Sequence, residues 1–80
     1  MITVYGKPSC VQCDATKRAM DQRGIRYRYL DLTTDREAQA RVAEFGYRQA
    51  PIVEVGPDRH WCGFRPDLIR EITPGMQDAE

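Results

Sequence analysis

Two cysteines, Cys10 and Cys13, stand two residues apart, and this C-x-x-C spacing is suited to dithiol–disulfide exchange. They follow a short β-type run, residues 2–5, and begin a helical stretch. The spacing allows the two sulfurs to close one ring, and the free N–H groups of a helix N-terminus favour thiolate over thiol at the first sulfur. The same motif also occurs as half of a zinc site or by accident, so all three interpretations stay open at this point.

Length and composition favour one small domain. Eighty residues leave no room for a second hydrophobic core, so we expect residues 1–72 to form a single domain. Residues 73–80 contain Pro74-Gly75 and few apolar side chains, and we expect them to be a flexible tail.

Charge and cysteine content argue against several classes of protein. Lys and Arg together number 12, as do Asp and Glu, and no basic block suggests nucleic-acid binding. No apolar run approaches the roughly 20 residues that cross a membrane, and the N-terminus lacks a signal-peptide pattern. Three cysteines are an odd number, which argues against a secreted disulfide framework. We therefore expect a cytoplasmic monomer with reactive thiols.

Strand and helix patterns alternate along the chain. They predict strands near residues 1–5, 26–32, 52–55 and 59–62, and helices near residues 11–23 and 34–46 and from Pro66 onward. Ser9 is the expected N-cap of the first helix, and Thr34 with Glu37 the capping box of the second. The order β-α-β-α-β-β-α predicts an α/β, thioredoxin-like fold with a four-stranded mixed sheet flanked by three helices. This fold places the cysteines at the carboxyl end of the first strand, where open α/β sheets gather their chemistry.

Pro51 has two interpretations. It opens an apolar strand, where a residue without an N–H is tolerated. Alternatively, a cis bond at Ala50-Pro51 presents the backbone of Ala50 to an extended substrate beside the cysteines. Spacing alone does not decide between them.

Four separated segments carry a resemblance to a known family: Cys10-Val11-Gln12-Cys13, residues 15–20, Arg48-Gln49-Ala50-Pro51 and Trp61-Cys62-Gly63-Phe64-Arg65-Pro66-Asp67. Their order and spacing resemble the NrdH-redoxins, glutaredoxin-like proteins that behave as thioredoxins. The resemblance implies a thioredoxin fold with Pro51 cis. It also implies reduction by NADPH through thioredoxin reductase and electron delivery to class Ib ribonucleotide reductase, with a redox-active Cys10–Cys13 disulfide and no bound cofactor.

Thiol–disulfide exchange requires different roles for the two cysteines. Cys10, at the first helical turn, is the expected nucleophile and forms a mixed disulfide with the substrate. Cys13, one turn further along and more buried, is expected to resolve that intermediate. Lys7 either adds positive charge near the thiol or is a solvated loop residue.

Glutathione binding is expected to be weak or absent. Gln49-Ala50 replaces the Thr-Val common before the proline of glutaredoxins, Arg65 inverts the charge expected near the γ-glutamyl end, and Pro66 lacks a donor N–H. A protein partner contacting an apolar rim fits better. The expected contact residues are Lys7, Val11, Gln12, Gln49, Ala50, Pro51, Trp61, Cys62, Gly63 and Phe64. The alternatives are a glutathione-dependent glutaredoxin and a metal or iron–sulfur module using Cys10, Cys13, Cys62 and His60.

Several contact residues also have a structural interpretation. Trp61 and Phe64 are rim residues or part of the core, and Gly63 is expected to allow close backbone approach beside Pro51. His60 is expected to face solvent. Cys62 stands where the resembling family has Ser. It is either a tolerated small residue or a third thiol that attacks a Cys10 mixed disulfide.

Overall fold

Seven elements follow one another in the predicted order. The computed structural model describes residues 1–72, and the predicted tail at residues 73–80 lies outside the described residues. The elements are β1 (Ile2–Gly6), α1 (Val11–Gln22), β2 (Tyr27–Asp31), α2 (Arg36–Phe45), β3 (Ile52–Gly56), β4 (Arg59–Cys62) and α3 (Pro66–Ile69).

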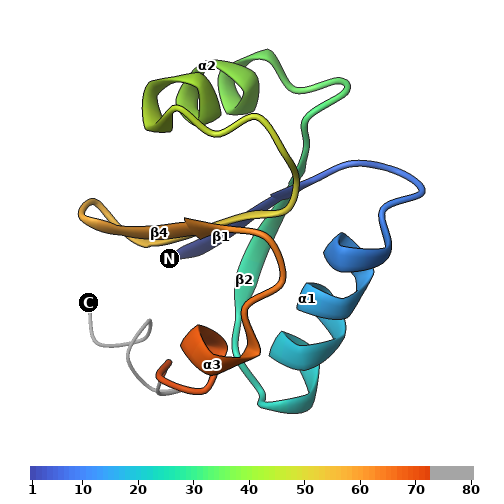
Figure 1. The fold of residues 1–80 in the computed structure, drawn as a ribbon, viewed down its shortest axis with the longest axis vertical. Helices are drawn as coiled ribbons and strands as arrows, with labels where there is room; N and C mark the ends of the chain where they lie inside the picture. Colours follow the sequence, from blue (N-terminus) through green and yellow to red (C-terminus); the bar gives the residue numbers. More distant parts are fainter. Residues whose placement is uncertain (73–80) are drawn as a thin grey trace.

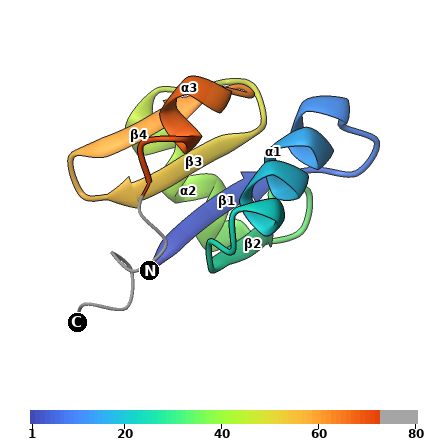
Figure 2. The ribbon, with the colours of Figure 1, turned by 90° about the horizontal axis from the view of Figure 1, so that it is seen from below.

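The four strands form one mixed sheet in the order β2-β1-β3-β4. β1 pairs parallel with β2 and antiparallel with β3, and β3 pairs antiparallel with β4. Helices α1 and α3 cover one face and α2 covers the other (Figure 1). Figure 2 shows the same layers from below, with α1 and α3 in front of the sheet and α2 behind it. The predicted thioredoxin-like fold is confirmed.

Strand alternation divides the core into two clusters. Ile2 and Val4 of β1 pack with Met20 of α1 and Ile69 of α3 on one face of the sheet. The neighbouring Tyr5 packs on the other face with a second cluster that includes Ala38 and Val42 of α2 and Ile52 of β3. Successive strand residues point to opposite faces, so each helix-covered face receives its own apolar set. The two clusters fix the sheet between its helices.

Both predicted helix caps were wrong by one residue. Cys10, not Ser9, is the N-cap of α1, because Ser9 has a left-handed φ of 57° and Cys10 is extended. Asp35, not Thr34, caps α2 through a bond from the Ala38 N–H to its Oδ1 at 2.9 Å. The turn that starts at Asp31 uses residues up to Thr34, since the N–H groups of Thr34 and Asp35 both bond the Asp31 carbonyl. Helix α2 therefore begins one residue later.

His60 does not face solvent as predicted. Its ring stacks on Phe45 of α2 with centroids 4.1 Å apart, and its Nδ1 lies 2.8 Å from the Tyr47 hydroxyl. Helix α2 crosses this side of β4, so a position that alternates outward along the strand is covered by a helix distant in sequence. At the start of α3, Arg65 and Asp67 form an ion pair, with Nη2 of Arg65 2.9 Å from Oδ2 of Asp67.

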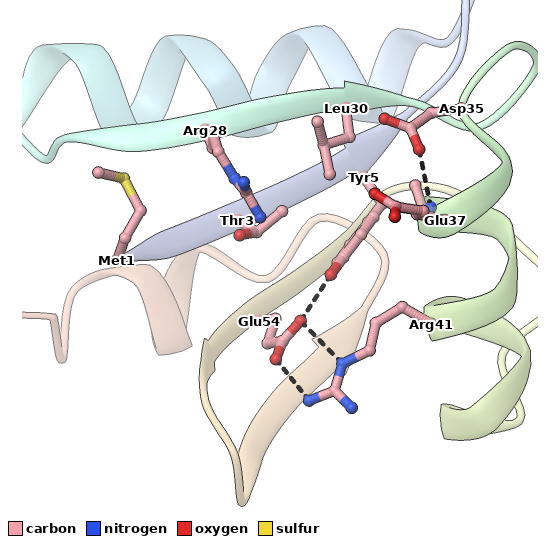
Figure 3. Close-up of a pocket in the computed structure, with 10 residues that line it drawn as sticks. Met1, Thr3, Tyr5, Arg28, Leu30, Asp35, Glu37, Arg41 and Glu54 are labelled. Carbon is pink, nitrogen blue, oxygen red and sulfur yellow. Dashed lines mark hydrogen bonds and ion pairs between the residues drawn. The ribbon is translucent and has the colours of Figure 1, made fainter.

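A polar network lies between the sheet and α2, beside a pocket of about 390 Å³ (Figure 3). The Tyr5 hydroxyl donates to Oε1 of Glu54 at 2.6 Å, and Nη2 of Arg41 lies 2.8 Å from Oε2 of Glu54. The bond from Arg41 holds the pKa of Glu54 below its usual value, and burial, followed by the bond to Glu54, raises the pKa of Tyr5 to about 12. The network ties α2 to β1 and β3.

We predict that Glu54→Gln loses stability mainly above pH 4.5, the ordinary pKa of a glutamate. The lowered pKa of Glu54 means that its stabilisation is present above that pH and disappears as pH falls through the folded-state value. The expected difference in unfolding free energy at neutral pH is about 1 kcal/mol, because the amide keeps part of the hydrogen bonding. Urea unfolding from pH 3 to 7 measures this difference, and a constant gap over that range would contradict the assignment.

Candidate active site at the Cys10–Cys13 disulfide

Cys10 and Cys13 form a disulfide at the start of α1, with Cα atoms 5.1 Å apart. The pair lies beyond the carboxyl end of β1, as predicted. Cys10 is 8% exposed and Cys13 is fully buried. The prediction that Cys10 is more exposed than Cys13 is therefore confirmed. Cys10 is the cysteine that a substrate can reach first.

The N-terminus of α1 directs a backbone N–H at the Cys10 sulfur. Cys10 is the N-cap residue, and its Sγ accepts the N–H of Cys13 at 3.1 Å. When the disulfide is reduced, this N–H and the positive end of the helix dipole favour the Cys10 thiolate. Asp14, in the same turn, forms an ion pair with Lys17, whose Nζ lies 3.8 Å from Oδ1 of Asp14.

An open pocket of about 370 Å³ adjoins the disulfide. We call it the Cys10 groove, and its lining residues are Lys7, Cys10, Val11, Gln12, Arg48, Gln49 and Ala50. It shares none of these with the pocket beside Glu54. Five of the predicted contact residues therefore lie together in this groove. Lys7, Val11 and Gln12 come from the stretch after β1, and Gln49 and Ala50 come from the stretch before β3.

Two features of the groove bear on partner contact. Val11 is 83% exposed and gives the groove an apolar edge next to Cys10. Arg48 adds a second cation to that of Lys7, and the sequence analysis missed it as a contact residue. The sequence did contain a signal for this residue. Arg48 stands two residues before Ala50, in the segment Arg48-Gln49-Ala50-Pro51 that carries part of the family resemblance.

The Ala50-Pro51 bond is cis, as the family resemblance implies. Pro51 is buried and directly precedes β3. The proline therefore also stands at the opening of a strand, as the first interpretation proposed. The N–H of Gly63 donates to the Pro51 carbonyl at 2.7 Å. This bond joins the end of β4 to the segment that lines the groove.

The backbone of Gly63 lies beside Pro51 as predicted, but glycine is needed there for its backbone angle rather than to make room for that approach. Its φ is +89°, in the region that glycine adopts readily and other residues rarely. A Cβ placed there would meet only Oε1 of Gln12, at an ordinary contact distance of 3.5 Å. The same Gln12 oxygen accepts the N–H of Phe64 at 3.1 Å, so Gln12 links α1 to the stretch after β4.

The two aromatic residues of this stretch are packing residues. Trp61 is only 6% exposed and belongs to the core cluster beneath α1 and α3. Phe64 is half-buried and packs against the same cluster. Of the two interpretations, the structure favours the core for Trp61, because its side chain has too little surface to form a rim.

Cys62 is a half-buried free thiol at the end of β4. Its Sγ donates to the Gln49 carbonyl at 3.2 Å, on the segment that lines the Cys10 groove. A serine hydroxyl can make the same bond.

We therefore predict that Cys62→Ser changes neither turnover nor the rate of inactivation by hydrogen peroxide. Disulfide-reduction assays before and after peroxide treatment measure both quantities. A variant that resists peroxide better than the wild type would show that Cys62 is a third redox-active thiol.

The described residues were also searched for metal-ligand clusters and for membrane-spanning helices. Within residues 1–72, no group of three or more His, Cys, Asp and Glu side chains is arranged to hold a metal ion. Over the same residues, no helix has the length and apolar character that crossing a membrane requires.

Comparisons with known proteins agree with this geometry. The glutaredoxin family model matches residues 2–61. The glutaredoxin-like protein NrdH of Escherichia coli K12 is 44% identical over 78 residues, covering 98% of this chain and 95% of its own. The Lactococcus lactis subsp. cremoris protein of the same description is 31% identical over 73 residues, covering 91% and 100%. The solved NrdH-redoxin of E. coli superposes with a TM-score of 0.84 at 44% identity, covering 91% of this chain and 95% of that one.

Proposed function

The chain belongs to the glutaredoxin family, among its glutaredoxin-like NrdH proteins, and on this basis we propose that it carries electrons from NADPH and thioredoxin reductase to class Ib ribonucleotide reductase. The observation that carries the proposal is the Cys10–Cys13 disulfide at a helix N-terminus beside an open groove. The E. coli NrdH-redoxin, of the same fold and 44% identical, is described as having a thioredoxin-like activity profile.

The proposed reaction transfers two electrons by two exchanges. The Cys10 thiolate attacks one sulfur of the partner's disulfide, and the partner's other sulfur leaves as a thiolate and takes up a proton. Cys13 then loses its proton and attacks the Cys10 sulfur, which releases the partner's second thiol. The partner gains a dithiol, and this chain is left with the Cys10–Cys13 disulfide. Thioredoxin reductase would return two electrons from NADPH to that disulfide.

The start of α3 supports a protein partner over glutathione. Arg65 is exposed and is held by both oxygens of Asp67, so a cation stands at this edge of the site. Pro66 occupies the first turn of α3 and has no N–H to offer a carboxylate. The apolar Val11 edge and the cations of Lys7 and Arg48 suit a larger polypeptide surface.

We also propose that the protein works in the cytoplasm as a monomer. An exchange-active dithiol needs a compartment that keeps it reduced, and thioredoxin reductase and glutathione maintain such a state there. The single disulfide of the described structure joins the two active-site cysteines rather than stabilising the fold from a distance.

The test is deoxyribonucleotide formation by a class Ib ribonucleotide reductase with this protein, pre-reduced and freed of reductant, as the sole electron donor. We expect one deoxyribonucleotide for each Cys10–Cys13 disulfide formed. Cys10→Ser is the matched control and should support none. Product formation at the level of that control would refute the proposed acceptor.

A further inference from the structure

The segment between α2 and β3 supplies half of the Cys10 groove, and it has no regular structure of its own. Arg48, Gln49 and Ala50 line the groove from this segment. Two bonds from the end of β4 hold its later part, one to the Gln49 carbonyl and one to the Pro51 carbonyl. The beginning of the segment, where the chain leaves α2, is held by Tyr47.

Tyr47 is bound to β4 through His60. Its hydroxyl lies 2.8 Å from Nδ1 of His60 and donates to the His60 carbonyl at 3.3 Å. A tyrosine hydroxyl both donates and accepts, so it can pair with this ring nitrogen whether or not the nitrogen carries a proton. The bond joins two parts of the fold, since Tyr47 is the second residue after α2 and His60 lies in β4.

Three rings make this connection rigid. The His60 ring stacks on Phe45 at 4.1 Å, and the Tyr47 ring meets the His60 ring edge-on at 5.5 Å. Phe45 is the last residue of α2 and lies 6.0 Å from the Tyr47 ring. These ring contacts therefore join the end of α2 and the edge strand β4 to Tyr47. Tyr47 directly precedes Arg48, the first residue of the segment that lines the groove.

We propose that Tyr47 is a positioning residue for disulfide exchange, holding the Arg48–Ala50 segment in place beside Cys10 through its hydroxyl contacts with His60. This inference rests on the proposed function, because it assumes that a polypeptide docks in the Cys10 groove. A groove that is ordered beforehand spares the partner the entropy of ordering it on binding. Loss of the hydroxyl weakens docking and leaves the reaction of the two sulfurs unchanged.

The experiment uses Tyr47→Phe, which keeps the ring and removes the hydroxyl. Insulin with its native disulfides intact is the substrate. Dithiothreitol reduces the Cys10–Cys13 disulfide after each turnover, so no reductase has to dock. We expect KM for insulin to rise about fivefold with kcat unchanged, the effect of one lost hydrogen bond. The backbone ¹⁵N order parameters of Gln49 and Ala50, measured by NMR, should fall in the same variant.

Tyr27→Phe is the matched control. The Tyr27 hydroxyl donates to Asp21 at 3.0 Å, between α1 and the edge strand β2, and neither residue lines the groove. This control loses one tyrosine hydrogen bond and should leave KM and the order parameters of Gln49 and Ala50 as in the wild type.

Three outcomes would overturn the positioning role: unchanged order parameters at Gln49 and Ala50, unchanged KM, or an equal KM rise in the Tyr27 control. These outcomes leave the proposed function intact, because the wild type still reduces insulin. A wild type that does not reduce insulin would instead contradict the disulfide-exchange activity on which the proposed function and the positioning role both rest.

Discussion

Cys10→Ser is expected to abolish disulfide reduction, with turnover falling by at least about 1,000-fold. The hydroxyl of serine is not ionised at neutral pH, so the variant has no nucleophile at the position that lines the groove. Cys13 cannot take over, because its side chain is fully buried beneath the first turn of α1. Turnover with oxidised insulin and with any protein partner should be lost together.

Cys62→Ser is the control for this loss, since it removes a thiol close to the same groove without touching the exchange pair. It should keep wild-type turnover. Substantial residual activity in Cys10→Ser would assign the attack to another sulfur and contradict the role of Cys10 as the nucleophile.

Cys13→Ser is expected to trap the partner as a mixed disulfide with Cys10. The first exchange still proceeds, because Cys10 and its helix N-terminus are unchanged. The second exchange stops, since the substituted hydroxyl cannot displace the partner's thiol. The adduct should appear on non-reducing gels and by mass spectrometry, and dithiothreitol should release it.

The matched control is Cys10→Ser, which should form no adduct under the same conditions. Glutathione offers a further distinction. Free glutathione can resolve a mixed disulfide in place of Cys13, so a glutathione-dependent protein would stay active without that cysteine. Cys13→Ser that retains full turnover with glutathione would therefore contradict the proposed two-cysteine mechanism.

The elements of this fold could be predicted because their signals are local. Alternation along residues 26–32 and the apolar positions Ala38, Val42 and Phe45 of α2 recur at the spacing of one strand face and one helix face. The same holds for the C-x-x-C pair, whose place at a helix start follows from adjacent sequence.

The errors concern features that depend on residues far apart. His60 is covered by Phe45, and nothing within its own strand indicates that neighbour. The predictions of the two helix caps failed for a different reason. At each helix start, two neighbouring side chains can accept a backbone N–H, and the turn geometry decides between them. These pairs are Ser9 with Cys10 and Thr34 with Asp35.

The candidate site shows both cases. The dithiol and five of its neighbours were predicted from residues within two short segments, and the structure brings them together in the Cys10 groove. Trp61 was placed among the partner contacts although it lies in the core, because an aromatic residue at strand spacing has the same pattern in either place. Tyr47 was not considered at all, since its contact with His60 joins two positions 13 residues apart.

The proposed electron route is tested most directly by NADPH consumption with oxidised insulin as the final acceptor, using two electron sources in parallel. One reaction contains thioredoxin reductase, and the other contains glutathione with glutathione reductase. We predict turnover with thioredoxin reductase and none above background with glutathione. Turnover with glutathione alone would mean that Arg65 and Pro66 do not prevent tripeptide binding, and the chain would then be a glutathione-dependent glutaredoxin.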